Sequence, residues 1–336
     1  MERLIAIDNV CAWPNLTMMP DGSIAAVVFN KPYHGFGEGH PECWISRDGG
    51  YGWERAGAPV RNDPGCNRMN VAAGLAGDGA LTVISSGWRL KQVPGEERPT
   101  FDQVLDPVVC RSSDGGASWQ VGGTVEKPEG ATGIVPFGDI VRLEDGVFGV
   151  SMYTCGEKGV TGESKFSSYF LRSYDGGRSW VEPVPIGELS SEAPNNNETT
   201  VLSIDGRRLL AAARTTGDLH VELYASDDGG RSWTGKGPVT LPLQHPANFL
   251  RLRDGRILLS FGIRCRGYFG VGARISKDDG ESWGAPIFLV DYEAVADGGY
   301  PSSVELDDGT IVTAYYSHKV PHHHRYHMGV VRWKAD

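Results

Sequence analysis

The chain has 336 residues, 40% of them hydrophobic, and a formal net charge of −10. This length suffices for two ordinary domains or one large all-β domain, and the negative charge argues against general nucleic-acid binding. No apolar run is long enough for a membrane span. The first ten residues, MERLIAIDNV, lack the pattern of a signal peptide. We therefore expect a cytoplasmic protein with no nucleic-acid or membrane partner.

Cysteine and histidine usage predicts no metal site and no other cofactor. None of the six cysteines belongs to a CxxC pair, so free buried thiols in a reducing compartment are expected. The run His322, His323 and His324 cannot point three adjacent rings at one ion, which favours a solvated loop. The glycine-rich pieces GFGEG and GYFGVG match no phosphate-binding template.

After a short apolar stretch, RLIAI, six segments along the chain place Asp-Gly between apolar residues. Strand, Asp-Gly turn and strand is the signature of a β-hairpin, because the turn needs positive φ. The six segments are MMPDGSIAAVVF, LAGDGALTVI, VRLEDGVFGV, LSIDGRRLLAAA, LRDGRILLSF and LDDGTIVTAYY, with turn aspartates Asp21, Asp78, Asp145, Asp205, Asp254 and Asp308.

An octapeptide of pattern Ser-x-Asp-x-Gly-x-x-Trp follows each of the first five hairpins. Its recurrence at a period of about fifty residues or more is typical of a propeller. The Ser and Asp side chains suit hydrogen bonds to turn amides, and the Trp is a large apolar anchor. The copies are SRDGGYGW (46–53), SSDGGASW (112–119), SYDGGRSW (173–180), SDDGGRSW (226–233) and SKDDGESW (276–283).

Together these repeats predict an all-β fold, a six-bladed β-propeller of four-stranded antiparallel blades forming a single domain over 1–336. A β-sandwich or two barrels is the alternative architecture. The Asp-Gly turns and the octapeptides would lie on one face, and RLIAI would pair with the last blade and close the ring. The binding site would then lie on the opposite face, where the loops converge on the axis.

That topology selects polar residues on the opposite rim in blades four and five. Glu198 and Arg214 flank one hairpin, where they form either a plain structural ion pair or part of a site. Arg264 and Arg266 are two residues apart, so on a continuing strand they share a face and suit carboxylate recognition. The alternative for these two is solvated loop arginines.

The remaining candidates lie in blades six, one and two. Tyr300, in GGYPSS, is either an aromatic wedge between blades or a phenol that acts beside a carboxylate. The loop KPYHGFGEGHPE supplies either a general acid or merely polar side chains. Its candidates, together with those of blade two, are His34, Glu38, His40, Arg68 and Trp88.

The octapeptides resemble the Asp boxes, or BNR repeats, of the sialidase (neuraminidase) superfamily. NETTVLSIDGRRLLAAAR is similar to the family segment in which a Glu assists the nucleophile and an Arg binds the substrate carboxylate, which maps onto Glu198 and Arg214. FGIRCRGYFGVGARISKDDG is similar to the segment with another carboxylate-binding arginine, Arg264 or Arg266. GGYPSSVELDDGTIVTAYY is similar to the segment with the nucleophilic tyrosine, here Tyr300.

The sequence departs from the family pattern in two places. Ala12, in CAWPNL, stands where the family has the first triad arginine, and Arg68 is the predicted replacement. The family's acid-base aspartate is also absent from the first long loop, which offers Glu38, His34, His40 and Glu42 instead.

The resemblance implies a sialidase-like exo-glycoside hydrolase acting on an anionic glycan, sialic-acid-like or uronic. Tyr300, polarised by Glu198, would attack the anomeric carbon, and arginines would hold the substrate carboxylate, with His34 and Trp88 as further substrate contacts. One alternative is a propeller polysaccharide lyase, in which His34, His40 or Tyr300 removes a proton from a uronate. A second alternative is a propeller that binds glycans without catalysis.

Overall fold

The computed structural model describes residues 1–336 apart from 156, 159–163, 190–194, 217–219, 294 and 336; the side chains at positions 12, 157, 158, 164 and 165 also lie outside the description. Within the described residues every regular element is a β-strand, except for the 3₁₀ turn η1 (Glu144–Gly146). The predicted all-β class is therefore confirmed. No helix found in these parts of the chain has the length and apolar character needed to span a membrane.

Four of the sheets have four strands each. In spatial order they are β2 (Cys11–Met18), β3 (Ile24–Phe29), β4 (Pro41–Ser46), β5 (Glu54–Gly57); β19 (Asn196–Ser203), β20 (Leu209–Thr215), β21 (Val221–Ser226), β22 (Thr234–Pro238); β23 (Gln244–Arg251), β24 (Ile257–Cys265), β25 (Tyr268–Ser276), β26 (Ile287–Asp291); and β27 (Gly299–Glu305), β28 (Ile311–Ser317), β29 (His327–Trp333), β1 (Glu2–Asp8).

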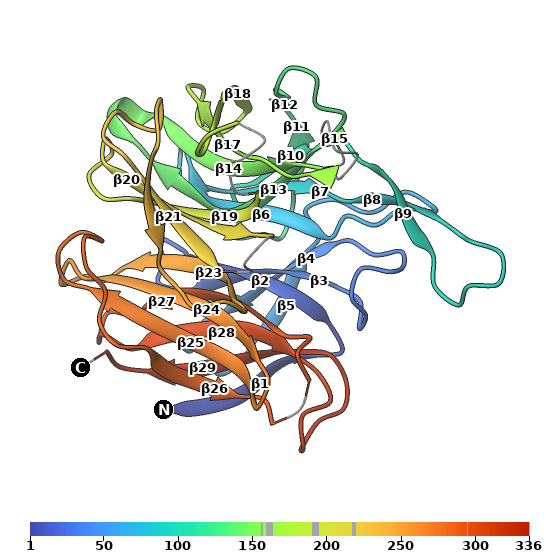
Figure 1. Ribbon diagram of the computed structural model, residues 1–336. Coiled ribbons are helices and arrows are strands. Elements are labelled where there is room, and N and C mark those ends of the chain that lie inside the picture. Colours follow the sequence, from blue (N-terminus) through green and yellow to red (C-terminus); the bar gives the residue numbers. More distant parts are fainter. Residues whose placement is uncertain (156, 159–163, 190–194, 217–219, 294, 336) are drawn as a thin grey trace.

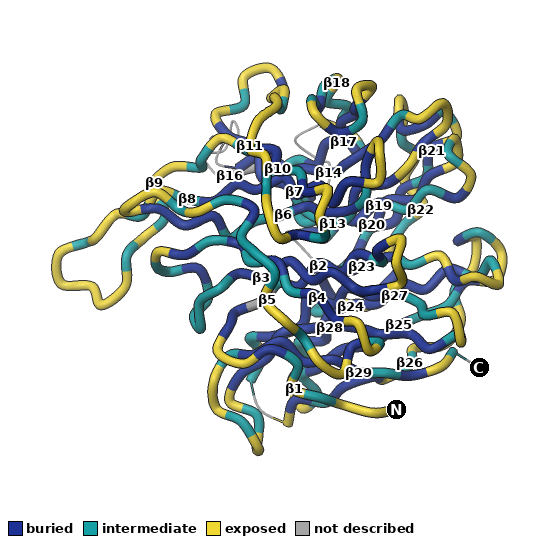
Figure 2. The backbone as a smooth tube through the Cα atoms, turned by 180° about the vertical axis from the view of Figure 1, so that it is seen from behind, coloured by how far each residue is buried: buried dark blue, intermediate teal, exposed yellow. Residues whose placement is uncertain are grey.

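A nine-stranded sheet and two small hairpins contain the other strands. The large sheet runs β11 (Gln120–Gly122), β10 (Val108–Ser112), β7 (Ala80–Ser86), β6 (Asn70–Ala76), β13 (Ile134–Arg142), β14 (Phe148–Thr154), β17 (Ser168–Ser173), β18 (Ser179–Pro185), β12 (Thr124–Val125). The hairpins are β8 (Trp88–Lys91) with β9 (Thr100–Val104), and β15 (Glu157–Lys158) with β16 (Ser164–Lys165). The loop of the β8–β9 hairpin is exposed and extends away from the body (Figure 2).

Each Asp-Gly segment forms the predicted antiparallel hairpin, between a first strand (β2, β6, β13, β19, β23 or β27) and the strand that follows it. The first strands contact one another in chain order, and β27 returns to β2. Two of them, β6 and β13, pair in parallel, which joins two sets of strands into the nine-stranded sheet. The first strands therefore form a closed ring, and the fold is β-propeller-like.

The two ends of the chain complete the last sheet. β1 pairs antiparallel with β29, so the N-terminal and C-terminal strands lie side by side and the termini are close together (Figure 1). The predicted pairing of RLIAI with the last sheet is confirmed. The N-terminal strand β1, which precedes the first sheet in the chain, is thus hydrogen-bonded into the last sheet. These hydrogen bonds resist opening of the ring between the last sheet and the first.

All five octapeptides make the same hydrogen bonds. The Ser hydroxyl accepts a hydrogen bond from the backbone amide of the glycine four residues after it, at 2.8–2.9 Å. The same hydroxyl donates to the Asp carboxylate at 2.7–2.9 Å. The same carboxylate accepts from the amide four residues after it at 2.8–2.9 Å. The conserved spacing of the motif is therefore a set of turn hydrogen bonds.

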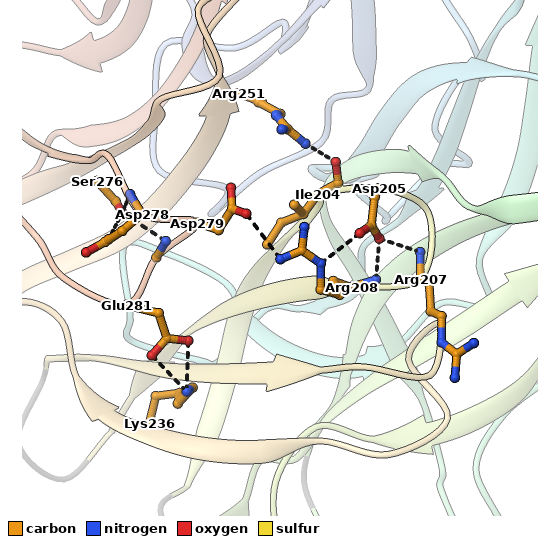
Figure 3. A network of polar contacts seen from close by, with 11 residues as sticks. Ile204, Asp205, Arg207, Arg208, Lys236, Arg251, Ser276, Asp278, Asp279 and Glu281 are labelled. Carbon is orange, nitrogen blue, oxygen red and sulfur yellow. Dashed lines mark hydrogen bonds and ion pairs between the residues drawn. The ribbon is translucent and has the colours of Figure 1, made fainter.

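Octapeptides and Asp-Gly turns meet on one face of the molecule. Arg208, after the turn at Asp205, donates to the carboxylate of Asp279 in the last octapeptide at 3.1 Å, and Ser276 and Asp278 lie beside it (Figure 3). The tryptophans of all five octapeptides are buried or half-buried, and Trp180 is fully buried. These motifs hold the sheets together at this face.

The cysteines are free in the structure, as expected from their spacing. Five are buried and Cys265 is half-buried. Burial is the largest cause that raises the pKa of Cys43, Cys110 and Cys155 to about 12. These thiols therefore remain protonated near neutral pH and act as small apolar side chains.

Ser226→Ala tests the octapeptide hydrogen bonds. The amide of Gly230 would lose its buried acceptor, so we expect the free energy of unfolding to fall by about 1–3 kcal/mol. Ser113→Ala is the control, because Ser113 is exposed at the variable second position of another octapeptide, and a change within about 0.5 kcal/mol is expected. Urea unfolding measures both, and equal losses would contradict this reading of the motif.

The octapeptide aspartates also predict a loss of stability in acid. The hydroxyl of Ser118 is the largest cause that lowers the pKa of Asp114 to about 2. The unfolded pKa is about 3.9, so the stabilisation is present above about pH 4 and is lost as the pH falls through about 2. Asp114→Asn should flatten the decline of unfolding free energy between these values, and Asp102→Asn, an exposed aspartate on β9, should leave it unchanged.

Candidate active site

Irregularities in the first strands create the site. The pairing register shifts in five of the six first strands: in β2 after Cys11, in β13 after Phe137, in β19 after Asn197, in β23 after Gln244 and in β27 after Gly299. A bulge of this kind re-aims the side chains that it carries. Proline, which strands tolerate only at edges or bulges, occurs in or beside four of them, at Pro14, Pro136, Pro246 and Pro301.

A cavity lies where these bulges converge, and all six first strands contribute to its wall. Its aromatic lining is Trp13, Trp88, Phe101, Phe137, Tyr153 and Tyr300. Its polar lining is Asn15, His34, Asn70, Glu198, Asn248 and Ser302. Among the described residues, Glu198 is the one carboxylate on this wall. No arginine and no octapeptide residue lines the cavity in the described parts of the chain.

Tyr300, Glu198 and Arg214 form one hydrogen-bonded group. The phenol of Tyr300 donates to Oε1 of Glu198 at 2.6 Å, and Nη1 of Arg214 donates to Oε2 of Glu198 at 2.6 Å. The same Nη1 is 3.4 Å from the phenol oxygen of Tyr300. The Glu198 carboxylate therefore has one oxygen on the phenol and the other on the guanidinium.

Burial and neighbouring charges set the pKa values of Tyr300 and Arg214 in this group. Burial is the largest cause that raises the pKa of Tyr300, and Glu198 raises it further, so the phenol is protonated and donates to the carboxylate. Burial alone would lower the pKa of Arg214, but Glu198 and Tyr300 outweigh it and hold the pKa above its usual value. Arg214 is therefore charged where it donates to the Glu198 carboxylate, beside a neutral phenol.

The backbone at Tyr300 is held in an uncommon conformation. Tyr300 has φ of 51°, in the left-handed region that bulky residues rarely adopt. The preceding Gly299 has φ of 103°, and a Cβ there would lie 3.1 Å from the Cα of Gly262. Local strain of this kind persists only where surrounding structure enforces it, and it clusters at functional sites.

Arg264 lies over the ring of Tyr300. Its guanidinium carbon is 5.4 Å from the centre of the Tyr300 ring, and its donors bind the carbonyl oxygens of His245 at 2.6 Å and Gly298 at 3.0 Å. Burial is the largest cause that lowers the pKa of His245 to about 2, so its neutral Nδ1 accepts from Arg264 at 2.9 Å. Arg264 thus binds the backbone next to Tyr300.

A further carboxylate, Asp139, contacts two asparagines of the cavity wall. Asp139 accepts from Asn15 at 3.0 Å and from Asn248 at 2.7 Å, one amide on each oxygen. Asp139 lines a second cavity, which opens towards the Asp-Gly turns. Burial raises the pKa of Asp139 to about 6 despite both amides. Asp139 therefore links three first strands, β13, β2 and β23.

The structure brings together part of the predicted site. Glu198, Tyr300, His34 and Trp88 line the cavity, and Arg214 and Arg264 contact Tyr300. The structure does not bring the other predicted residues to the wall: Glu38, His40, Arg68 and Arg266.

Each of these four has a different environment. Glu38 is exposed and accepts from the amide of Gly65 at 2.8 Å. His40 has its ring nitrogens on the amides of Asn62 and Asn30. Arg68 is buried and donates to the carbonyl of Asp106. Arg266 is exposed in the turn after β24, because the strand ends at Cys265 instead of continuing as expected.

Sequence reasoning missed Asp297, Met69 and Phe101. Met69 and Phe101 line the cavity, and Asp297 contacts His34 at 2.9 Å. A signal existed for Asp297, which lies three residues before Tyr300 in the stretch ADGGY. Phe101 had no signal, because the β8–β9 hairpin that carries it is an insertion outside the repeat.

The chain matches the model of a protein family described as "BNR repeat-like domain" over residues 35–313. The chain belongs to this family. The predicted resemblance of the octapeptides to BNR repeats is confirmed. A search of curated proteins gave no match for this BNR repeat-like protein. Within the described residues no cluster of three or more His, Cys, Asp or Glu side chains suits a metal ion.

Solved structures similar to this BNR repeat-like protein include sialidases. A protein of unknown function from Dyadobacter fermentans has a TM-score of 0.83 and 22% identity, covering 100% of this chain and 98% of that one. A mutant of NanB sialidase from Streptococcus pneumoniae has a TM-score of 0.70 and 12% identity, and the match covers 99% of this chain and 70% of that one. Trypanosoma rangeli sialidase in complex with the inhibitor DANA has a TM-score of 0.67 and 14% identity, and the match covers 99% of this chain and 56% of that one.

These likenesses show a sialidase-like fold, in a chain that spans only part of the sialidase chains. The identities of 12–22% establish no activity for this chain.

A double-mutant cycle tests the buried ion pair. Glu198→Gln, Arg214→Met and their combination should give a coupling of about 1–3 kcal/mol in the free energy of unfolding, since either single change leaves a partly buried charge unpaired. The control cycle uses Arg253 and Asp307, an exposed pair on the turn face, with an expected coupling below about 1 kcal/mol. Equal couplings would contradict the described environment of Glu198.

Proposed function

We propose that this chain is a sialidase-like exo-glycoside hydrolase built as a six-bladed β-propeller of four-stranded blades, in one domain over 1–336. The hydrogen bond between Tyr300 and Glu198, on the wall of the axial cavity, is the observation that carries the proposal. The ring of six first strands and the five octapeptides support the propeller. The BNR repeat-like family and the sialidase neighbours support glycans as substrates.

The Tyr300–Glu198 pair has the arrangement of an activated nucleophile. Its phenol proton is already directed at Oε1 of Glu198, so the carboxylate can accept that proton as the phenol oxygen attacks the anomeric carbon. Arg214 and Arg264 lie close enough to stabilise negative charge developing on the phenol oxygen. A neutral phenol also avoids repulsion with a substrate carboxylate.

The cavity walls suit a sugar ring. Trp13, Trp88, Phe101 and Phe137 line the cavity with apolar ring surface that suits the C–H groups of a sugar. Asn70 offers its amide nitrogen to sugar hydroxyl groups, whereas the amide nitrogens of Asn15 and Asn248 already donate to Asp139.

An anionic substrate depends on Arg214. It is the one of the four predicted arginines that contacts Glu198, and its Nε has no hydrogen-bond partner in the described parts of the chain. Arg214 does not line the cavity and its Nε is buried, so a substrate carboxylate binds Arg214 only if side chains of the wall move. The other three predicted arginines bind backbone carbonyls or lie in an exposed turn, so we assign them no carboxylate contact.

A substrate screen tests the class of reaction. Sialyl, rhamnosyl and uronyl glycosides should be incubated with the protein and followed for released sugar and for ultraviolet absorption. Release without new absorption supports hydrolysis. An unsaturated, absorbing product from uronyl substrates would instead establish the lyase, which His34 on the same wall favours. Binding without any product would establish the non-catalytic glycan-binding propeller.

Tyr300→Phe tests the nucleophile on whichever glycoside is cleaved. Loss of the phenol oxygen should lower kcat by at least about 100-fold with little change in substrate binding, because only the attacking atom is removed. Tyr268→Phe is the matched control, since that phenol binds the carbonyl of Val290 away from the cavity, and its kcat should change less than about twofold. Full activity of Tyr300→Phe would refute the sialidase-type mechanism.

A further inference from the structure

A histidine and an aspartate form a second polar pair on the cavity wall. His34 lines the cavity, and its Nδ1 is 2.9 Å from Oδ1 of Asp297. An ionised carboxylate can only accept, so Nδ1 of His34 carries the hydrogen of this bond. Nε2 of His34 has no hydrogen-bond partner among the described residues, which leaves it able to exchange a proton with a molecule in the cavity.

The surroundings of Asp297 keep it ionised. The phenols of Tyr316 and Tyr326 donate to its two oxygens at 2.6 Å and 2.5 Å, and Nε2 of His318 lies 3.5 Å from Oδ2. Burial alone would raise the pKa of Asp297, but the hydrogen bonds from His34 and the two phenols outweigh it and hold the pKa well below its usual range. A fixed negative charge therefore faces the His34 imidazole from behind.

The loop that carries His34 is held in place by Asn67, which lies just before β6. The side chain of Asn67, which is fully buried, donates to the carbonyl of Gly35 at 2.6 Å and accepts from the amide of Trp88 at 3.0 Å. The ring of His34 also packs edge-on against Trp13, at 4.9 Å between ring centres. These contacts fix the imidazole in one orientation towards the cavity.

His34 and Tyr300 flank the same tryptophan. The Tyr300 ring packs edge-on against Trp13 at 6.2 Å, and both rings also neighbour Tyr316. Asp297 lies three residues before Tyr300 on the segment that enters β27. One segment therefore supplies the phenol and the carboxylate that orients the imidazole, so their positions are coupled through the backbone.

We propose that His34 is the general acid–base of glycoside cleavage at this site and that Asp297 is its positioning residue. The proposal rests on the proposed function. In the first step the Tyr300 oxygen bonds to the anomeric carbon, and the bond to the leaving oxygen breaks. The phenol proton passes to Glu198, and the proton on Nε2 of His34 passes to the leaving oxygen.

The second step restores every group. Water attacks the anomeric carbon, the bond to Tyr300 breaks, and Glu198 returns the proton to the phenol oxygen. Nε2 of His34 takes the proton from the attacking water and is again protonated for the next cycle. The nearby Asp297 carboxylate stabilises that imidazolium without itself taking up a proton.

His34→Gln on the full chain tests the assignment, with pairs of substrates that share one sugar. The sugar is the one cleaved in the screen, as its methyl glycoside and its 4-nitrophenyl glycoside. We expect kcat/KM to fall by about 100-fold or more for the methyl glycoside, which needs protonation of its leaving oxygen. The 4-nitrophenyl glycoside, whose leaving group needs little protonation, should lose less than about tenfold.

Asp297→Asn should give the same dependence on the leaving group at smaller size. Loss of the Asp297 charge makes the His34 imidazolium less stable but leaves Nε2 in place. We therefore expect kcat/KM to fall about tenfold for the methyl glycoside and to change little for the 4-nitrophenyl glycoside. A merely structural effect would lower both substrates equally. The matched control is His323→Gln, because His323 also binds an aspartate, Asp8, but lies outside the cavity. It should leave both values unchanged.

The outcomes separate this proposal from the proposed function. Inactivity of Tyr300→Phe combined with full methyl-glycoside activity of His34→Gln would overturn the acid–base assignment and leave the hydrolase standing. Selective loss of the methyl glycoside in Glu38→Gln or His40→Ala, with His34→Gln unaffected, would do the same. Failure of the native chain to cleave any glycoside would overturn both proposals.

Discussion

The geometry of the site depends on the closing of six first strands around one axis. Regular antiparallel strands would alternate their side chains along their whole length, but five of these strands shift register near the cavity. The shifts turn Trp13, Glu198 and Tyr300 towards the axis. Closure of the ring through β1 and β29 holds the last first strand, and with it Tyr300, against the others. The positive φ of Trp13 and Tyr300 is thus sustained by the ring as a whole.

Within this ring the two carboxylates of the site have opposite surroundings. Glu198 binds a phenol that donates a proton and a guanidinium that holds its charge, so it is placed to receive the phenol proton. Asp297 accepts from two phenols and an imidazole, and its charge is held in place. Carboxylates in different environments can serve different roles in one reaction. Each role follows from its hydrogen-bond donors, since the two groups are chemically alike.

The predicted site succeeded where topology determined position and failed where it depended on loops. Glu198 and Arg214 flank a hairpin of known register, so their meeting could be expected from the sequence. Arg266 failed because β24 ends one residue before it, and an exposed turn replaces the expected strand face. Glu38 and His40 failed because the direction of a loop side chain depends on its partners, here Gly65, Asn30 and Asn62, which no period in the sequence reveals.

The sequence by itself determined the all-β class, the Asp-Gly hairpins, the octapeptide hydrogen bonds and the pairing of the two chain ends. Those features are local or repeated, so turn chemistry and spacing suffice to predict them. Tertiary structure alone decided that His34 meets Asp297 beside the cavity. His34 and Asp297 are far apart in the chain, and they meet because the ring returns the last first strand to the first. A contact between distant segments depends on the closure of the whole fold, and no local pattern in the sequence encodes it.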